Sequence, residues 1–154
     1  MGTYKVRKSL QSAPPNLKYE KYLWEEGVRY VAGIDEVGKG AWAGPLTIVA
    51  AIVPQEKRIY KVRDSKLLKE PERESLFSKI SKWCVTWAVG HASNDECDEL
   101  GMSESQKLAA RRAIEGLSIV PEHYLIDGKW DFVGHAVGAT KVTKIIKGDT
   151  KCLS

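Results

Sequence analysis

Residues 30–53 of this 154-residue chain read YVAGIDEVGKGAWAGPLTIVAAIV. The runs Tyr30–Asp35 and Leu46–Val53 are rich in apolar and β-branched residues, and a turn containing Gly38 and Gly40 lies between them. This pattern predicts two antiparallel strands, at least one of which is buried on both faces.

The glycines of residues 38–44 argue against two nucleotide-binding folds. Their spacing, G-x-G-x-x-x-G, differs from the G-x-G-x-x-G of a dinucleotide fold, and an apolar strand follows where that fold has a helix. Residues 33–39 come close to a P-loop. However, Gly40 replaces the Ser or Thr that holds magnesium, and Asp35 and Glu36 occupy positions where phosphate oxygens would lie.

The rest of the chain alternates between helical and extended patterns. Residues 1–16 are expected to form a polar N-terminal arm, and residues 17–154 a single domain that opens with a short helix over 17–27. Apolar residues at helical spacing predict a helix with one buried face after Pro71. That face consists of Leu76, Phe77, Ile80, Trp83 and Cys84.

Two Ser-x-x-Glu/Gln boxes predict further helix starts. Ser93 with Glu96 begins a short helix that stops at Gly101, and Ser103 with Gln106 begins a longer one. Additional strands are expected over residues 85–91, 124–126 and 144–146. This order of elements describes an α/β domain with a mixed β-sheet flanked by helices.

Composition favours a soluble, cytoplasmic protein with no membrane partner. The chain is 43% hydrophobic and 29% charged, and its apolar runs are far shorter than the roughly 18–20 residues that cross a bilayer. Its start has no continuous apolar stretch that would act as a secretion signal. Three cysteines without a CxxC pair encode neither a disulfide framework nor a zinc ribbon. The net charge of +4 permits a polyanionic partner without requiring one.

Acidic residues recur where the predicted strands end. Asp35 and Glu36 end one strand, Asp127 ends another, and Asp149 follows a third. Oxygen-only clusters suit magnesium or manganese, and although Asp is common in turns, three acidic strand ends in one small domain favour a metal site. Asp35 and Glu36 would point to opposite faces of a regular strand, so both serve one site only if the strand ends or bulges there.

Four segments, in order along the chain, resemble the type 2 ribonucleases H, the family of bacterial ribonuclease HII. They are residues 33–45 (GIDEVGKGAWAGP), 64–68 (DSKLL), 126–128 (IDG) and 147–149 (KGD). The resemblance implies an RNase H-like fold with a site for two Mg2+ or Mn2+ ions. It also identifies the metal-binding, catalytic carboxylates as Asp35, Glu36, Asp127 and Asp149.

The resemblance further implies contacts with nucleic acid. Gly38, Lys39 and Gly40 match the loop that contacts the 2′-hydroxyl side of an RNA–DNA junction, and Ser65 and Lys66 match a segment expected to contact a phosphate. Lys39 stands where the family usually has Arg, so it keeps the charge but loses the planar guanidinium fork. The expected partner is an RNA–DNA hybrid or ribonucleotide-containing duplex DNA, and no protein partner is indicated.

The implied activity is metal-dependent endonucleolytic cleavage of the RNA strand of RNA–DNA hybrids, including at single ribonucleotides embedded in duplex DNA, as ribonucleotide excision requires. Cleavage would leave 5′-phosphate and 3′-hydroxyl ends. The chain stops soon after Asp149, without the family's C-terminal helical part, so we expect a fragment or incomplete reading frame with exposed apolar sheet faces. The alternatives are a truncated, non-catalytic nucleic-acid-binding fragment and another metal-dependent phosphotransfer enzyme or nuclease on the same fold.

Overall fold

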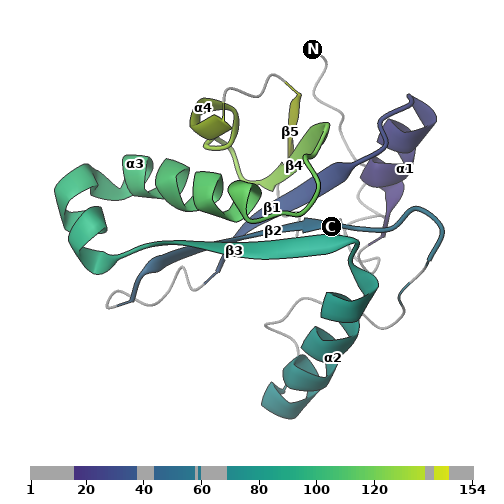
Figure 1. The fold of residues 1–154 in the computed structure, drawn as a ribbon, viewed down its shortest axis with the longest axis horizontal. Coiled ribbons are helices and arrows are strands. Elements are labelled where there is room, and N and C mark those ends of the chain that lie inside the picture. The colour runs from purple at the N-terminus through teal and green to yellow at the C-terminus, as the bar shows by residue number, and fades with distance from the viewer. Residues whose placement is uncertain (1–15, 38–43, 58, 60–68, 138–140, 146–154) are drawn as a thin grey trace.

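The computed structural model describes residues 16–37, 44–57, 59, 69–137 and 141–145. Within them, five strands form one mixed sheet in the order β3-β2-β1-β4-β5 (Figure 1). The strands are β1 (Val31–Val37), β2 (Leu46–Ile52), β3 (Thr86–Ala92), β4 (His123–Asp127) and β5 (Val142–Ile145). Because β1 pairs antiparallel with β2 and parallel with β4, the predicted strand pair and mixed α/β sheet are both confirmed.

The sheet has a separate apolar cluster on each face. The helices are α1 (Lys18–Glu25), α2 (Glu70–Trp83), α3 (Asn94–Glu115) and α4 (Gly134–Val137). Since alternate residues of a strand point to opposite faces, Ile34 enters the larger cluster beneath α3, and Val31 enters a smaller one beneath α1. No helix in these described parts of the chain is both long enough and apolar enough to cross a membrane.

Close contact between α3 and β3 depends on small residues. A Cβ added at Gly90 would lie 2.0 Å from the carbonyl oxygen of Ala109, so only glycine fits there. Arg112 reinforces the contact, because its guanidinium donates to the carbonyl oxygen of His91 at 2.7 Å. The same guanidinium donates to both carboxylate oxygens of Glu96, at 2.7 and 2.8 Å, and so ties the two ends of α3 together.

The helix α3 consists of two segments joined at Gly101, whose φ of +77° favours glycine. This confirms the predicted stop at that residue. The first capping box also forms, because the Glu96 N–H donates to Ser93 Oγ at 3.2 Å and the Ser93 N–H donates to Glu96 Oε2 at 2.9 Å. The second predicted box is wrong, since the Gln106 side chain turns toward the sheet and uses both ends of its amide there.

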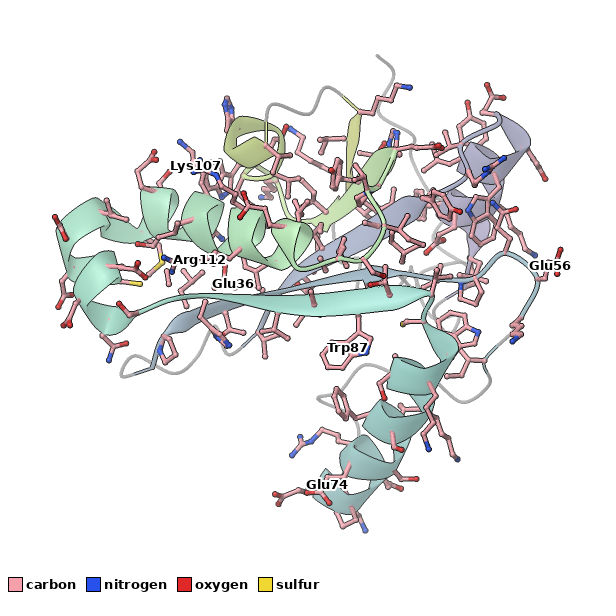
Figure 2. All side chains as sticks on the ribbon, in the orientation of Figure 1. Glu36, Glu56, Glu74, Trp87, Lys107 and Arg112 are labelled. Carbon is pink, nitrogen blue, oxygen red and sulfur yellow. The ribbon has the colours of Figure 1, made fainter. Side chains whose placement is uncertain are left out.

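The prediction of a buried face on α2 is also wrong. None of its residues is buried, and the helix runs away from the sheet on the side opposite α3 (Figure 1). Phe77 of α2 packs edge-to-face on Trp87 of β3, with ring centroids 5.6 Å apart, yet 58% of Phe77 and 38% of Trp87 stay exposed. Trp87 lies on the side of β3 that faces α2 (Figure 2). Val89 of β3 is also exposed, so among the described residues α2 covers this face of the sheet only in part. Helical spacing predicts an apolar face but does not specify the surface that covers it.

Candidate active site

Two carboxylates lie at the same level of neighbouring parallel strands. β1 and β4 pair in register through Ile34 and Ile126, and the next residues along the strands are Asp35 and Asp127. Neighbouring strands are about 4.8 Å apart, so the two aspartates lie next to each other on adjacent strands. Strand alternation places both on the face opposite the buried isoleucines.

Pairing between the two parallel strands ends one residue before these aspartates. The last β1–β4 pair is Ile34 and Ile126, whereas β1 and β2 stay paired as far as Val37 and Thr47. Gly128, with a φ of +130°, turns the chain after Asp127, and its N–H donates to the carbonyl oxygen of Ile145 at 3.1 Å. Asp127 lies opposite Ile145, so the parallel strand β5 ends at the same edge of the sheet.

Asp35 and Glu36 point to opposite faces of β1. The strand is regular through both residues, with Asp35 opposite Val49 and Glu36 opposite Ile48, so neither a strand end nor a bulge intervenes. Asp35 Oδ1 accepts the Glu36 backbone N–H at 2.8 Å, and the Glu36 side chain lies on the α3 side of the sheet (Figure 2). The expectation that the strand ends or bulges at these residues is therefore wrong. A cation held by both carboxylates would have to lie past the last β1–β4 pair, Ile34 and Ile126, and between the two faces of the sheet.

The Glu36 carboxylate is bound by a side chain of α3. Gln106 Nε2 donates to Glu36 Oε2 at 2.5 Å, and Gln106 Oε1 accepts the indole N–H of Trp130 at 3.1 Å. Gln106 is only 8% exposed, and the Trp130 ring packs near Phe132 with centroids 5.8 Å apart. These hydrogen bonds connect β1, α3 and the loop between β4 and α4 at the candidate site.

Gln106 and Trp130 are not among the site residues predicted from sequence. A signal for Gln106 is nevertheless present, because residues 106, 109, 110 and 113 form one helical stripe whose other members are buried alanines. A glutamine on such a stripe needs hydrogen-bond partners, since an unpaired buried amide is costly. Trp130 has no comparable signal, because it lies in the loop after β4, where no helical stripe marks a buried position.

Six predicted site residues lie outside the residues that the structure describes, namely Gly38, Lys39, Gly40, Ser65, Lys66 and Asp149. Of the four predicted metal ligands, Asp35 and Asp127 come together, and Glu36 lies on the other face of the same strand edge. Over the described ranges alone, no group of three or more His, Cys, Asp or Glu side chains is arranged to hold a metal ion.

Residues 32–153 match the family model for ribonuclease HII. The chain belongs to this family. A ribonuclease HII of Streptomyces avermitilis is 42% identical over 142 residues, which make up 92% of this chain and 60% of that relative. The chain therefore spans about three fifths of the length of a curated ribonuclease HII.

Solved structures agree with this family assignment. The crystal structure of the ribonuclease H2 from Pyrococcus horikoshii OT3 has a TM-score of 0.68 at 29% identity, covering 79% of this chain and 64% of that one. Bst-RNase HIII, crystallised in complex with Mn2+, has a TM-score of 0.61 at 19% identity and covers 97% of this chain and 53% of that one, a likeness of fold alone. The resemblance to ribonuclease HII and the RNase H-like α/β fold are thus confirmed.

Proposed function

We propose that this ribonuclease HII chain carries a metal-dependent endonuclease site that cuts the RNA strand of RNA–DNA hybrids, including at single ribonucleotides embedded in duplex DNA. The products would carry 5′-phosphate and 3′-hydroxyl ends. The observation that carries the proposal is the placement of Asp35 and Asp127 at one level of two parallel strands. The choice of substrate rests on the family's motifs in residues 33–45, 64–68, 126–128 and 147–149.

The donor chemistry of these carboxylates fits Mg2+ or Mn2+. All candidate ligands offer oxygen, which both ions prefer, and carboxylates placed side by side repel one another unless a cation is present. Asp35 and Asp127 would hold a cation from one face of the sheet and Glu36 from the other, with Asp149 as the proposed fourth ligand. Held by these carboxylates, two such ions would supply the activation of a water and the stabilisation of the charge on the departing 3′-oxygen.

Other residues of the chain would position the substrate. Gly38 and Gly40 lack side chains, which allows a sugar-phosphate backbone to approach the loop closely, and Lys39 would neutralise a phosphate. Ser65 and Lys66 are proposed as further phosphate contacts. Discrimination between RNA and DNA would depend on contacts to the 2′-hydroxyl, which DNA lacks. No side chain needs to act as a nucleophile, since water attacks the phosphorus.

Substrate choice tests the proposal. The 154-residue chain is incubated with Mg2+ or Mn2+ and one of three duplexes of the same sequence: an RNA–DNA hybrid, a DNA duplex with one ribonucleotide, and an all-DNA duplex. We expect cleavage of the first two only, and no cleavage after chelation of the metal. Equal cleavage of all-DNA would indicate a different nuclease. Binding of the ribonucleotide duplex without cleavage would indicate a nucleic-acid-binding fragment, and either result would overturn the proposal.

A further inference from the structure

We infer that Gln106 is a positioning residue for the candidate active site: together with Trp130, it orients the Glu36 carboxylate for metal binding. The inference rests on the proposed function, because it takes Glu36 as a metal ligand. It is carried by the hydrogen bonds from Trp130 to Gln106 and from Gln106 to Glu36.

The indole N–H of Trp130 determines which way the Gln106 amide points. An indole nitrogen can only donate, whereas a side-chain amide has one donor end and one acceptor end. Gln106 Oε1 accepts the indole N–H at 3.1 Å, so Gln106 Nε2 faces Glu36 and donates to its Oε2 at 2.5 Å. The reverse orientation would place two donors together and two acceptors together, and both hydrogen bonds would be lost. Trp130 therefore acts on Glu36 through Gln106.

The burial of Gln106 makes this hydrogen bond an effective restraint on Glu36. Gln106 is 8% exposed on a helix packed against the sheet, so its side chain has few alternative positions. Hydrogen bonds to an ionised carboxylate are stronger than those between neutral groups. This bond uses one lone pair of Glu36 Oε2 and fixes the plane of the carboxylate, while its other lone pairs stay available to a cation. Because the carboxylate is already fixed, its side chain loses less conformational entropy when a metal ion binds.

The neutral charge of Gln106 suits this role. A Lys or Arg at position 106 would also hold Glu36, but its positive charge would compete with the cation for the carboxylate. An amide restrains the oxygen without neutralising it. Gln106 therefore supports a ligand while leaving the charge of the site available to the metal.

Mn2+ titration by calorimetry, without nucleic acid, tests this role in the 154-residue chain. Gln106→Leu keeps a side chain of similar size but removes both hydrogen bonds, and we expect the Kd for Mn2+ to rise about tenfold. Trp130→Phe keeps an aromatic ring near Phe132 but removes the N–H, so we expect a smaller rise. The double variant should bind Mn2+ as Gln106→Leu does, because Trp130 acts through Gln106.

Gln55→Leu is the matched control, since the exposed Gln55 donates to the Arg29 carbonyl oxygen at 3.0 Å, beyond the opposite end of β1. Its Kd for Mn2+ should equal that of the unsubstituted chain. A merely structural role of Gln106 would lower the melting temperature of Gln106→Leu without changing the Kd of the folded protein, and that result would overturn the inference. Additive effects in the double variant would also overturn it. Trp130 is 38% exposed, so Trp130→Phe should fold even if Gln106→Leu does not. In that case a raised Kd of Trp130→Phe for Mn2+ supports the inference, and an unchanged Kd overturns it.

Cleavage of the single-ribonucleotide duplex separates this inference from the proposed function. If the Mn2+ affinity depends on Gln106 but the chain cuts no duplex, the proposed cleavage is refuted and the positioning role of Gln106 stands. A chain that cuts the duplex with an Mn2+ affinity independent of Gln106 would refute the positioning role alone. Failure of the unsubstituted chain to bind Mn2+ would overturn both.

Discussion

Asp35 and Asp127 occupy the same level of two parallel strands, although β2, α2, β3 and α3 lie between them in the chain. Each aspartate directly follows a buried isoleucine, Ile34 or Ile126. The pairing of these isoleucines determines the position of each carboxylate along its strand. Two negative charges so placed repel each other in the absence of a cation. This relationship makes the metal-free and metal-bound proteins respond differently to the same substitution.

Asp35→Asn and Asp127→Asn should each abolish metal-dependent cleavage without lowering the melting temperature of the metal-free protein. Each change removes a metal ligand, but it also removes a charge from a cluster that repels itself without metal. Cleavage at saturating Mg2+ and thermal melting in chelator provide the two measurements. Asp98→Asn, at an exposed position of α3, is the control and should retain cleavage. Near-normal cleavage by either site variant would refute the carboxylate assignment.

Gly90→Ala should reduce the free energy of unfolding by about 1–3 kcal/mol or more, the range for overpacked cores. The added Cβ would lie 2.0 Å from the carbonyl oxygen of Ala109, a backbone atom that moves only if α3 shifts away from β3. Denaturant unfolding measures the change. Gly44→Ala is the control, because nothing lies within 4 Å of a Cβ at that position. Equal unfolding midpoints for the two variants would contradict close packing of α3 on β3.

The ion pair between Glu96 and Arg112 should make stability depend on acid pH. Hydrogen bonds from Arg112 and then from the Ser93 backbone lower the pKa of Glu96 from 4.5 to about 2. A carboxylate with a lower pKa in the folded state stabilises the protein above its unfolded pKa, and this stabilisation is lost as pH falls through the folded pKa. The relevant window therefore runs from pH 4.5 down to about 2.

Glu96→Gln tests this dependence. The variant should melt at a lower temperature than the unsubstituted chain at pH 7, and the difference should disappear as the pH approaches 2. Glu99→Gln, at an exposed position of the same helix, should show no such pH-dependent difference. A melting difference for Glu96→Gln that persists at pH 2 would contradict the role of its charge.

Gly38→Val and Gly40→Val should weaken binding to a duplex with one ribonucleotide more than Lys39→Ala does. The proposed role of the loop depends on close backbone approach, which a valine side chain obstructs, whereas Lys39 contributes mainly charge. Lys39→Ala should reduce the slope of log affinity against log salt by about one. Fluorescence anisotropy across a salt series, with metal chelated, measures both quantities. Equal losses for all three variants would contradict this division of roles.

Much of the fold could be predicted from short stretches of sequence. Apolar, β-branched runs around a glycine-containing turn in 30–53 predict β1 and β2, and the Ser93 box and Gly101 predict the start and the break of α3. These predictions succeed because strand propensity, capping and a positive φ each depend on a few neighbouring residues. The prediction of a buried face on α2 is wrong because burial requires a second surface that packs on the helix, and that surface is formed by residues far away in the chain.

The sequence alone places Asp35 directly after a buried apolar run and Asp127 at the end of a strand, and it carries the motifs typical of ribonuclease HII. It does not place Asp35 correctly within its strand, because β1 continues to Val37. Only the tertiary structure established that these aspartates share one level, that Glu36 faces α3, and that Gln106, itself hydrogen-bonded to Trp130, donates to the Glu36 carboxylate. The physical reason is the range of the interactions. Periodicity and motifs record which side chains a segment offers, whereas strand register and buried hydrogen bonds depend on how segments far apart in the chain pack together.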